Sequence, residues 1–183
     1  MIAFSLGARI AFASIAKNKD LIRKAHLTGI AAERDAMSKM IFDSWKDLLD
    51  KEKNPTLKSF AWSILFKSYS QEFVESNGPD KLAVWVDQIC ANNNQDGLLN
   101  LVEQTSITDP IDYVPAVQAS NTKIQLAVGG EDVISTKSQV ERLNAALENS
   151  NDVLCYEGCG HAVANENARE WRRDVIAFLY DEN

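Results

Sequence analysis

The hydrophobic and polar positions of this chain follow three successive patterns, and each predicts a different kind of structure. In the first, an apolar stretch at residues 1–4 leads through a glycine-flanked turn into an alanine-rich helix that ends near Lys19, and residues 25–30 read as a buried strand. In the second, residues 36–117, apolar side chains recur at i, i+3 and i+4, which is typical of amphipathic helices. This middle region has no convincing strand.

The third pattern returns to an alternation of strands and helices. Strand, helix, strand and helix in succession indicate parallel pairing with right-handed crossovers, so the sequence predicts an α/β fold. We expect strands at residues 123–128 and 153–156 and helices at residues 137–147 and 166–180.

The expected architecture is a mostly parallel sheet of about four strands, built from residues 1–35 and 118–183. Residues 36–117 are then an insertion into this sheet, which we expect to form a helical lid. A chain of 183 residues that is 45% hydrophobic and 25% charged has the composition of one globular domain with a buried core.

The charge of the chain narrows the choice of partners. A formal net charge of −7 opposes binding to nucleic acid or to anionic lipid, which leaves a small molecule as the expected partner. The apolar N-terminal stretch has no preceding positive region and contains Arg9, so it does not read as a signal peptide. No apolar run reaches the ~18 residues of a transmembrane helix. We expect a soluble protein, cytoplasmic by default.

Three cysteines are too few for a disulfide framework and favour a reducing compartment. Cys155, Cys159 and His161 lie close together in sequence and suggest zinc, with Cys90 as a conceivable fourth ligand. The spacing Cys-x3-Cys-x-His is not a common zinc pattern, however, and Cys155 is better explained as a small apolar strand residue. We expect no metal and no cofactor.

The most informative short motif is the segment at residues 3–7, Ala-Phe-Ser-Leu-Gly, between an apolar strand and a helix. It differs from Gly-x-Ser-x-Gly only at Ala3. Small residues at both flanks let backbone approach a tight strand-to-helix turn, where a serine nucleophile is exposed above the sheet. Ser5 is therefore a candidate nucleophile, and the backbone N–H of Leu6 a candidate oxyanion donor. The alternative is that Ser5 caps the helix.

A serine nucleophile needs a base, and the chain has two histidines, His26 and His161. His26 falls inside the expected strand at residues 25–30, where a buried, hydrogen-bonded structural histidine is the better interpretation. His161 lies in a glycine-bearing loop after the last strand. Loops at the carboxyl ends of parallel strands face the site in α/β folds, so His161 is the candidate base.

The acid that orients the histidine should also follow a strand, and Asp132 does so through Gly-Gly-Glu after residue 128. Asp109 and Asp112 flank prolines and are better explained as turn residues. Glu131, next to Asp132, remains an alternative acid. Ser5, Asp132 and His161 thus occur in the order nucleophile, acid, histidine, each directly after an expected strand.

With these residues in place, the chain resembles the lid-bearing serine esterase and lipase branch of the α/β-hydrolase superfamily. The likeness covers the whole chain: residues 5–11 resemble the nucleophile elbow, 27–35 the next strand and the start of the lid, 129–132 the acid loop and 158–163 the histidine loop. The resemblance implies a Ser-His-Asp triad that hydrolyses ester or related acyl bonds through an acyl-enzyme.

The family pattern also implies four strands and a glycine-rich oxyanion loop before the elbow, whereas only four residues precede Ser5. The sequence therefore reads as an N-terminally truncated member of the family, with one oxyanion donor and impaired activity. We expect an exposed edge at the elbow strand, with Ile10, Phe12 and Ile15 uncovered beside it and self-association as a consequence. The alternative function is a non-catalytic fragment, or an interaction module that pairs through this edge.

The middle region supplies the aromatic side chains that would roof the site and select the substrate. Packing within the lid is the simpler role for most of them. The candidates are Trp45, Phe60, Trp62, Phe66, Tyr69 and Trp85.

Overall fold

The computed structural model describes residues 1–149 and 151–180. Its centre is a parallel sheet in the order β1-β2-β3-β4, which confirms the expected mostly parallel sheet of about four strands. The carboxyl ends of these strands lie side by side, because Phe4 pairs with Thr28, Thr28 with Ala127, and Gly129 with Tyr156. The strands are β1 (Ile2–Phe4), β2 (Lys24–Thr28), β3 (Lys123–Gly129) and β4 (Leu154–Tyr156).

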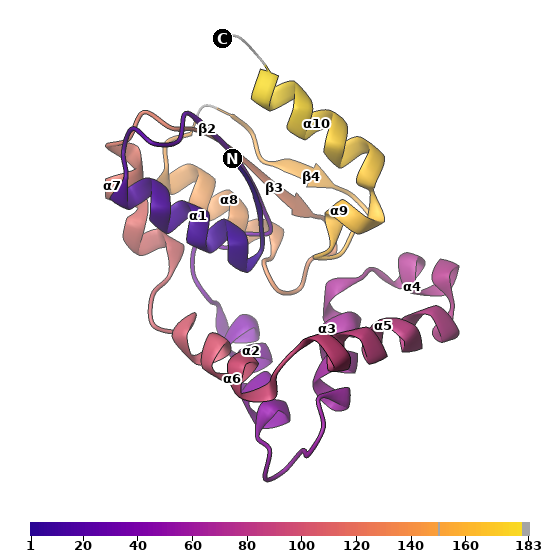
Figure 1. Ribbon diagram of the computed structural model, residues 1–183. Helices are drawn as coiled ribbons and strands as arrows, with labels where there is room; N and C mark the ends of the chain where they lie inside the picture. Colours follow the sequence, from indigo (N-terminus) through magenta and orange to yellow (C-terminus); the bar gives the residue numbers. More distant parts are fainter. Residues whose placement is uncertain (150, 181–183) are drawn as a thin grey trace.

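Helices cover both faces of this sheet (Figure 1). On one face, α1 (Leu6–Lys17), α7 (Val114–Gln118) and α8 (Lys137–Ala146) bury apolar side chains against Leu27 and Leu126. On the other face, α9 (Val163–Glu166) and α10 (Ala168–Tyr180) cover Ala127 and Tyr156. Side chains alternate between the two faces along a strand, so β3 contributes to both cores.

The apolar face of α1 is not exposed as expected from the sequence. Phe12 and Ile15 are fully buried, because both point into the core that α1 shares with α7 and β2. Only Ile10 of the three lies on the outside, with 59% of its surface exposed. The expectation was wrong for Phe12 and Ile15 because α7, which follows the helical region, returns to cover α1.

The chain between β2 and α7 is helical, and among the described residues none between 36 and 117 is in a strand. Figure 1 shows the helices gathered beyond the strand ends. Their bounds are α2 (Ala36–Leu49), α3 (Lys58–Ser68), α4 (Gln71–Asn77), α5 (Pro79–Asn92) and α6 (Gln95–Gln104), followed by a short 3₁₀ helix η1 (Pro110–Tyr113).

The division into a core and a helical lid at residues 36–117 stays a prediction. Val114 and Val117 belong to the core cluster beneath the sheet, whereas Trp45 and Phe60 form a separate cluster with α6. Packing therefore groups α7 with the sheet and α2 to α6 with one another. In the part of the chain that is described, no helix has the length and apolar character required to cross a membrane.

Candidate active site

Ser5 is the single residue between β1 and α1, and its backbone is strained. Its φ of 51° and ψ of −120° lie in a region that favours glycine, and its N–H donates to the carbonyl of Thr28 at 2.9 Å. Strain of this kind costs about 1–3 kcal/mol and persists where the surrounding structure imposes it. Ser5 occupies the N-cap position of α1, but its side chain makes no capping hydrogen bond. The hydroxyl is therefore left for another partner.

That partner is His161, whose Nε2 lies 2.7 Å from Oγ of Ser5. The other ring nitrogen, Nδ1, lies 2.7 Å from Oδ2 of Asp132. Both the imidazole and the carboxylate are buried, with side-chain exposures of 6% and 0%. The structure thus brings together all three residues that the sequence singled out as nucleophile, base and acid.

The second carboxylate oxygen of Asp132 holds the acid in place. Oδ1 accepts the backbone N–H groups of Ile134 and Ser135, each at 2.8 Å. These bonds fix the carboxylate with Oδ2 facing the imidazole. An ionised carboxylate in this position binds Nδ1–H and leaves the lone pair of Nε2 to accept the proton of Ser5.

Glycines let the three loops approach one another closely. Gly29, directly after β2, has a φ of +69°, and a Cβ there would lie 2.9 Å from Cε1 of His161. Gly129, at the end of β3, has no room for a side chain because the carbonyls of Cys159 and Gly160 approach it. Gly7, by contrast, has nothing within 4 Å of where its Cβ would be. No neighbour in the described part of the chain crowds this position, so the structure gives no reason for a small residue on this side of Ser5.

The backbone N–H of Leu6 lies at the start of α1, next to Ser5. The first N–H groups of a helix have no carbonyl one turn earlier to bind, and the helix dipole makes this end favourable for negative charge. Leu6 also lines the cavity that Ser5 and His161 share. The N–H of Leu6 therefore remains a candidate oxyanion donor.

The competing acids have other roles. Asp109 binds the guanidinium groups of Arg9 at 3.2 Å and Arg34 at 3.0 Å. Asp112 accepts the backbone N–H of Asp109 in a capping box. Glu131 is exposed, and the carboxylate that lies against Nδ1 of His161 belongs to Asp132.

His26 is buried in β2, on the face that α10 covers. Its Nδ1 lies 3.4 Å from the hydroxyl of Thr28, and the rings of Trp171 and Phe178 contact it edge-on. Burial lowers the pKa of His26 to about 4, and the nearby Asp174 opposes this only in part. His26 is a neutral core residue here. Within residues 1–149 and 151–180, no group of three or more His, Cys, Asp or Glu side chains is placed to hold a metal ion.

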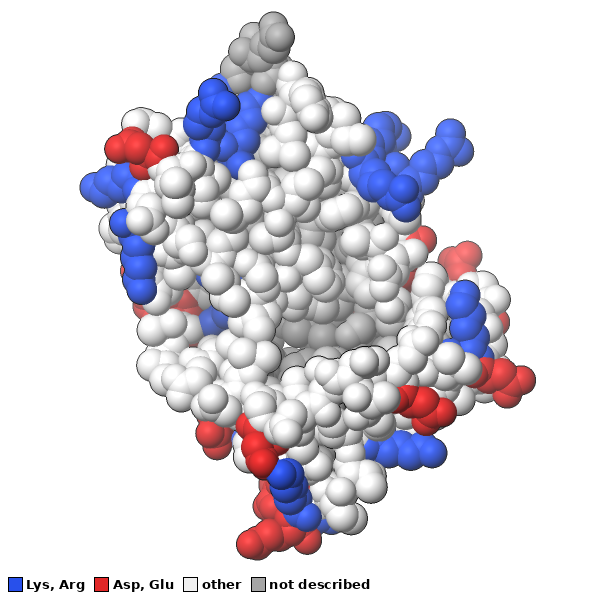
Figure 2. All heavy atoms as spheres, in the orientation of Figure 1, with Lys and Arg blue, Asp and Glu red and all other residues white. Residues whose placement is uncertain are grey.

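A cavity of about 190 Å³ lies between the carboxyl ends of the strands and the helices α2, α3 and α6. Ser5 and His161 line it on the side of the sheet, while α2, α3 and α6 contribute mostly apolar walls. The face in Figure 2 is hollowed between the sheet and these helices, and its charged side chains lie around the outside of the hollow. Two of the six candidate aromatic residues, Trp45 and Phe60, line the cavity.

The other candidate aromatic residues stack on one another away from this cavity. Trp62 stacks on Phe66, and Tyr69 packs against Phe73 and Trp85. The sequence pattern did not separate these two groups, because helical periodicity marks an apolar face without saying what that face meets.

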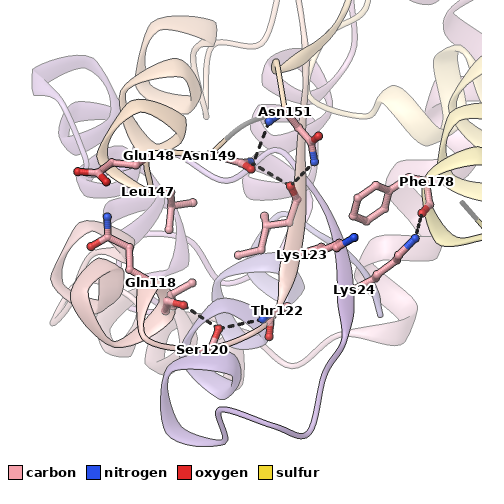
Figure 3. A pocket seen from close by; sticks show the side chains of 12 residues that line it. Lys24, Gln118, Ser120, Thr122, Lys123, Leu147, Glu148, Asn149, Asn151 and Phe178 are labelled. Atoms are coloured by element: carbon pink, nitrogen blue, oxygen red, sulfur yellow. Dashed lines mark hydrogen bonds between the residues drawn. The ribbon is translucent and has the colours of Figure 1, made fainter. Parts of the chain in front are cut away.

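A second, larger cavity of about 500 Å³ lies at the opposite end of the strands (Figure 3). Lys24 and Lys123, the first residues of β2 and β3, line it together with Asn149 and Asn151. The amide groups of both asparagines donate to the carbonyl of Ile124. None of the candidate catalytic residues lines this cavity.

Several solved structures superpose on nearly the whole of this chain. The chain superposes on MGS-M2, an α/β hydrolase enzyme from a Medee basin deep-sea metagenome library, with a TM-score of 0.87 and 19% identity over 100% of this chain and 65% of that one. It superposes on the enol-lactonase from Burkholderia xenovorans LB400 with a TM-score of 0.81 and 19% identity, over 98% of this chain and 65% of the other. This chain has the α/β-hydrolase fold.

An esterase from Exiguobacterium antarcticum shares the α/β-hydrolase fold at a TM-score of 0.77, with 14% identity over 97% of this chain and 65% of the esterase. Among curated proteins, the pyrrolizixenacetamide deacetylase of Xenorhabdus hominickii is 24% identical over 185 aligned residues, which span 100% of this chain and 66% of the deacetylase. No family model matches the chain. The chain thus spans about two thirds of the length of the proteins it matches, in agreement with the expected shortfall relative to the α/β-hydrolase pattern.

Proposed function

We propose that this chain carries the catalytic triad of a serine hydrolase of the esterase and lipase type, which cleaves ester or related acyl bonds. The observation that carries the proposal is the distance of 2.7 Å between Oγ of Ser5 and Nε2 of His161. A serine hydroxyl becomes a nucleophile when a neutral imidazole accepts its proton. No other described serine is bonded to a histidine side chain in this way.

The reaction follows from the roles of the three side chains. Oγ of Ser5 attacks the carbonyl carbon as Nε2 of His161 takes the hydroxyl proton, and Asp132 stabilises the imidazolium that forms. The proton then passes to the leaving alcohol or amine, which departs and leaves an ester on Ser5. Water attacks this acyl-enzyme, with His161 again accepting and returning a proton.

The N–H of Leu6 binds the oxyanion of each tetrahedral intermediate. Loss of one of two oxyanion donors costs about 10²- to 10³-fold in rate. With Leu6 as the donor that this chain supplies at the elbow, we expect turnover to be slower than in longer enzymes of this fold. Acylation of Ser5 is the step to examine first, because it needs the nucleophile and the base but not repeated turnover.

The names of similar proteins favour acyl chemistry. A deacetylase, an esterase and an enol-lactonase are among them, and each name denotes removal or opening of an acyl bond. We assign α2, α3 and α6 the role of a lid, because they supply the apolar walls of the cavity above Ser5. Apolar walls favour a substrate with a hydrophobic part and exclude bulk water.

Stopped-flow measurement with 4-nitrophenyl acetate tests the proposal. We expect a burst of nitrophenolate close to one equivalent per chain, followed by slow turnover. The burst disappears in Ser5→Ala and persists in Ser14→Ala, a matched control whose hydroxyl donates to a carbonyl within α1. A burst of equal size in Ser5→Ala would sink the proposal.

One observation favours a second function, pairing through the sheet edge. Within the described residues, β1 pairs with β2 and no strand pairs with its other edge, and Ile2 and Ile10 are 50% and 59% exposed. An open edge beside apolar side chains is suited to adding another strand. Light scattering against concentration tests this, with a dimer or larger assembly expected and a monomer at all concentrations contradicting it.

A further inference from the structure

Arg34 is a buried cation whose hydrogen bonds are only partly made. It is 9% exposed, and it lines the same cavity as Ser5 and His161. Nη1 donates to Asp109 at 3.0 Å, whereas Nε and Nη2 are buried without a hydrogen-bond partner. Buried polar groups are nearly always paired, and a charged group left unpaired is more costly than a neutral one.

The two unpaired nitrogens belong to one edge of the guanidinium group. Nε–H and the adjacent N–H of Nη2 point in parallel, which is the geometry that binds a carboxylate through both oxygens. The face of the group is already occupied, because its central carbon lies 5.0 Å from the centre of the Phe42 ring. The hydrogen bonds that Arg34 can still make are therefore those of one planar edge with two N–H donors.

The charged side chains that line the cavity are cationic. Arg9 and Arg34 share the carboxylate of Asp109, and no Asp or Glu among the described residues lines the cavity itself. Burial and the neighbouring charge of Arg9 lower the pKa of Arg34, although a guanidinium stays protonated at any physiological pH. The described residues that line the cavity thus include two cations and no anion, in a protein whose net charge is −7.

Arg9 makes more hydrogen bonds than Arg34 does. Its Nη2 donates to the backbone carbonyls of Thr105 and Thr108 as well as to Asp109. These bonds connect α1, one turn beyond Ser5, to the end of α6. Arg9 therefore has a structural role, and the unused donors belong to Arg34.

We propose that Arg34 recognises a carboxylate on the substrate, so that the cavity takes acyl compounds that carry a free acidic group beside a hydrophobic part. This rests on the proposed hydrolase function for the reaction, but not for the binding. The carboxylate accepts both N–H groups of the unpaired edge of Arg34, while Trp45 and Phe60, which line the cavity, contact the apolar part. Because both nitrogens are buried, the side chains that cover them must shift for the ligand to reach this edge.

A matched pair of ligands tests the proposal without turnover. The ions of 4-methylpentanoate and the neutral molecule 4-methylpentanamide have the same size and shape and differ in charge. In ligand-observed NMR titrations of the whole chain, we expect the carboxylate to bind about 10- to 100-fold more tightly, the factor expected of charge-assisted hydrogen bonds. Equal affinity for the two ligands overturns the proposal.

Substitutions of Arg34 test whether this side chain causes the preference for the carboxylate ligand. Arg34→Met should remove it, and Arg34→Lys, which keeps a cation for Asp109 but lacks the two-donor edge, should lose most of it and serves if Arg34→Met does not fold. Arg142→Met is the control, because Arg142 pairs with Glu33 and does not line the cavity. A preference that survives in both Arg34 variants, or that Arg142→Met abolishes, contradicts the assignment. Absence of the nitrophenolate burst would overturn the hydrolase proposal alone, since the titrations do not involve Ser5.

Discussion

The hydroxyl of Ser5 and the imidazole of His161 lie 2.7 Å apart although 156 positions separate them in the sequence. Parallel strands in register place the loops that follow them at one edge of the sheet, and this brings the two residues together. The contact is therefore a direct consequence of the α/β topology. Its chemistry depends on the third residue, Asp132.

Asp132→Asn should reduce the rate of acylation by about 10⁴-fold with little loss of structure. The backbone N–H groups of Ile134 and Ser135 hold Oδ1 of Asp132, so the amide nitrogen of an asparagine would face Nδ1 of His161. An N–H donor there forces the proton onto Nε2, which can then no longer accept from Ser5. Burst kinetics measure the effect. Glu131→Gln is the matched control, and an equal loss in it would contradict the role of Asp132.

Gly29→Ala should weaken both stability and activity. The new Cβ would meet Cε1 of His161 at 2.9 Å, on a backbone with a φ of +69°. We expect stability to fall by about 1–3 kcal/mol and the acylation rate by about 10²-fold, because the imidazole must move. Urea unfolding and burst kinetics measure the two effects.

Gly7→Ala is the control for Gly29→Ala. Nothing lies within 4 Å of a Cβ at Gly7, which is inside α1. Alanine in a helix is about 0.5–1 kcal/mol more favourable than glycine, so this variant should be slightly more stable and keep its activity. Damage from Gly7→Ala equal to that from Gly29→Ala would show that crowding at His161 is not the cause.

Acid should destabilise the protein through His26. The pKa of His26 is lowered to about 4 in the folded chain, against 6.5 for an ordinary histidine. Between these two pH values the unfolded chain therefore binds a proton that the folded chain does not bind. Stability is full above pH 6.5 and falls as the pH drops towards 4, by about 3 kcal/mol in all. Urea unfolding from pH 7 to pH 4.5 measures this loss. His26→Gln should flatten the curve by about one proton, and an unchanged slope would exclude His26 as the cause.

The sequence predicted the sheet and the three candidate catalytic residues because both depend on the order of strands, loops and helices along the chain. Ser5, Asp132 and His161 each follow a strand, and the carboxyl ends of parallel strands share one edge. Gly29 was missed as a contact of His161, although a glycine directly after a buried strand is a usable signal.

Other features depend on long-range packing that periodicity does not encode. The burial of Phe12 depends on α7, which lies about 100 positions later in the chain. Arg34 reads in sequence as an ordinary surface cation, and only the position of Asp109 and the cavity reveals its unpaired edge. Likewise, the choice of Trp45 over Trp62 as a cavity residue follows from how α2 and α3 pack.

Labelling with a fluorophosphonate, followed by peptide mass spectrometry, tests the central claim most directly. The probe phosphonylates a serine only where a base activates its hydroxyl, so it reports on the assembled pair of Ser5 and His161. We predict one label per chain, on Ser5, with none in Ser5→Ala, a strongly reduced rate in His161→Gln and an unchanged rate in Ser14→Ala. Failure to label Ser5 in the folded chain, or labelling that persists at the same rate in His161→Gln, would contradict the account.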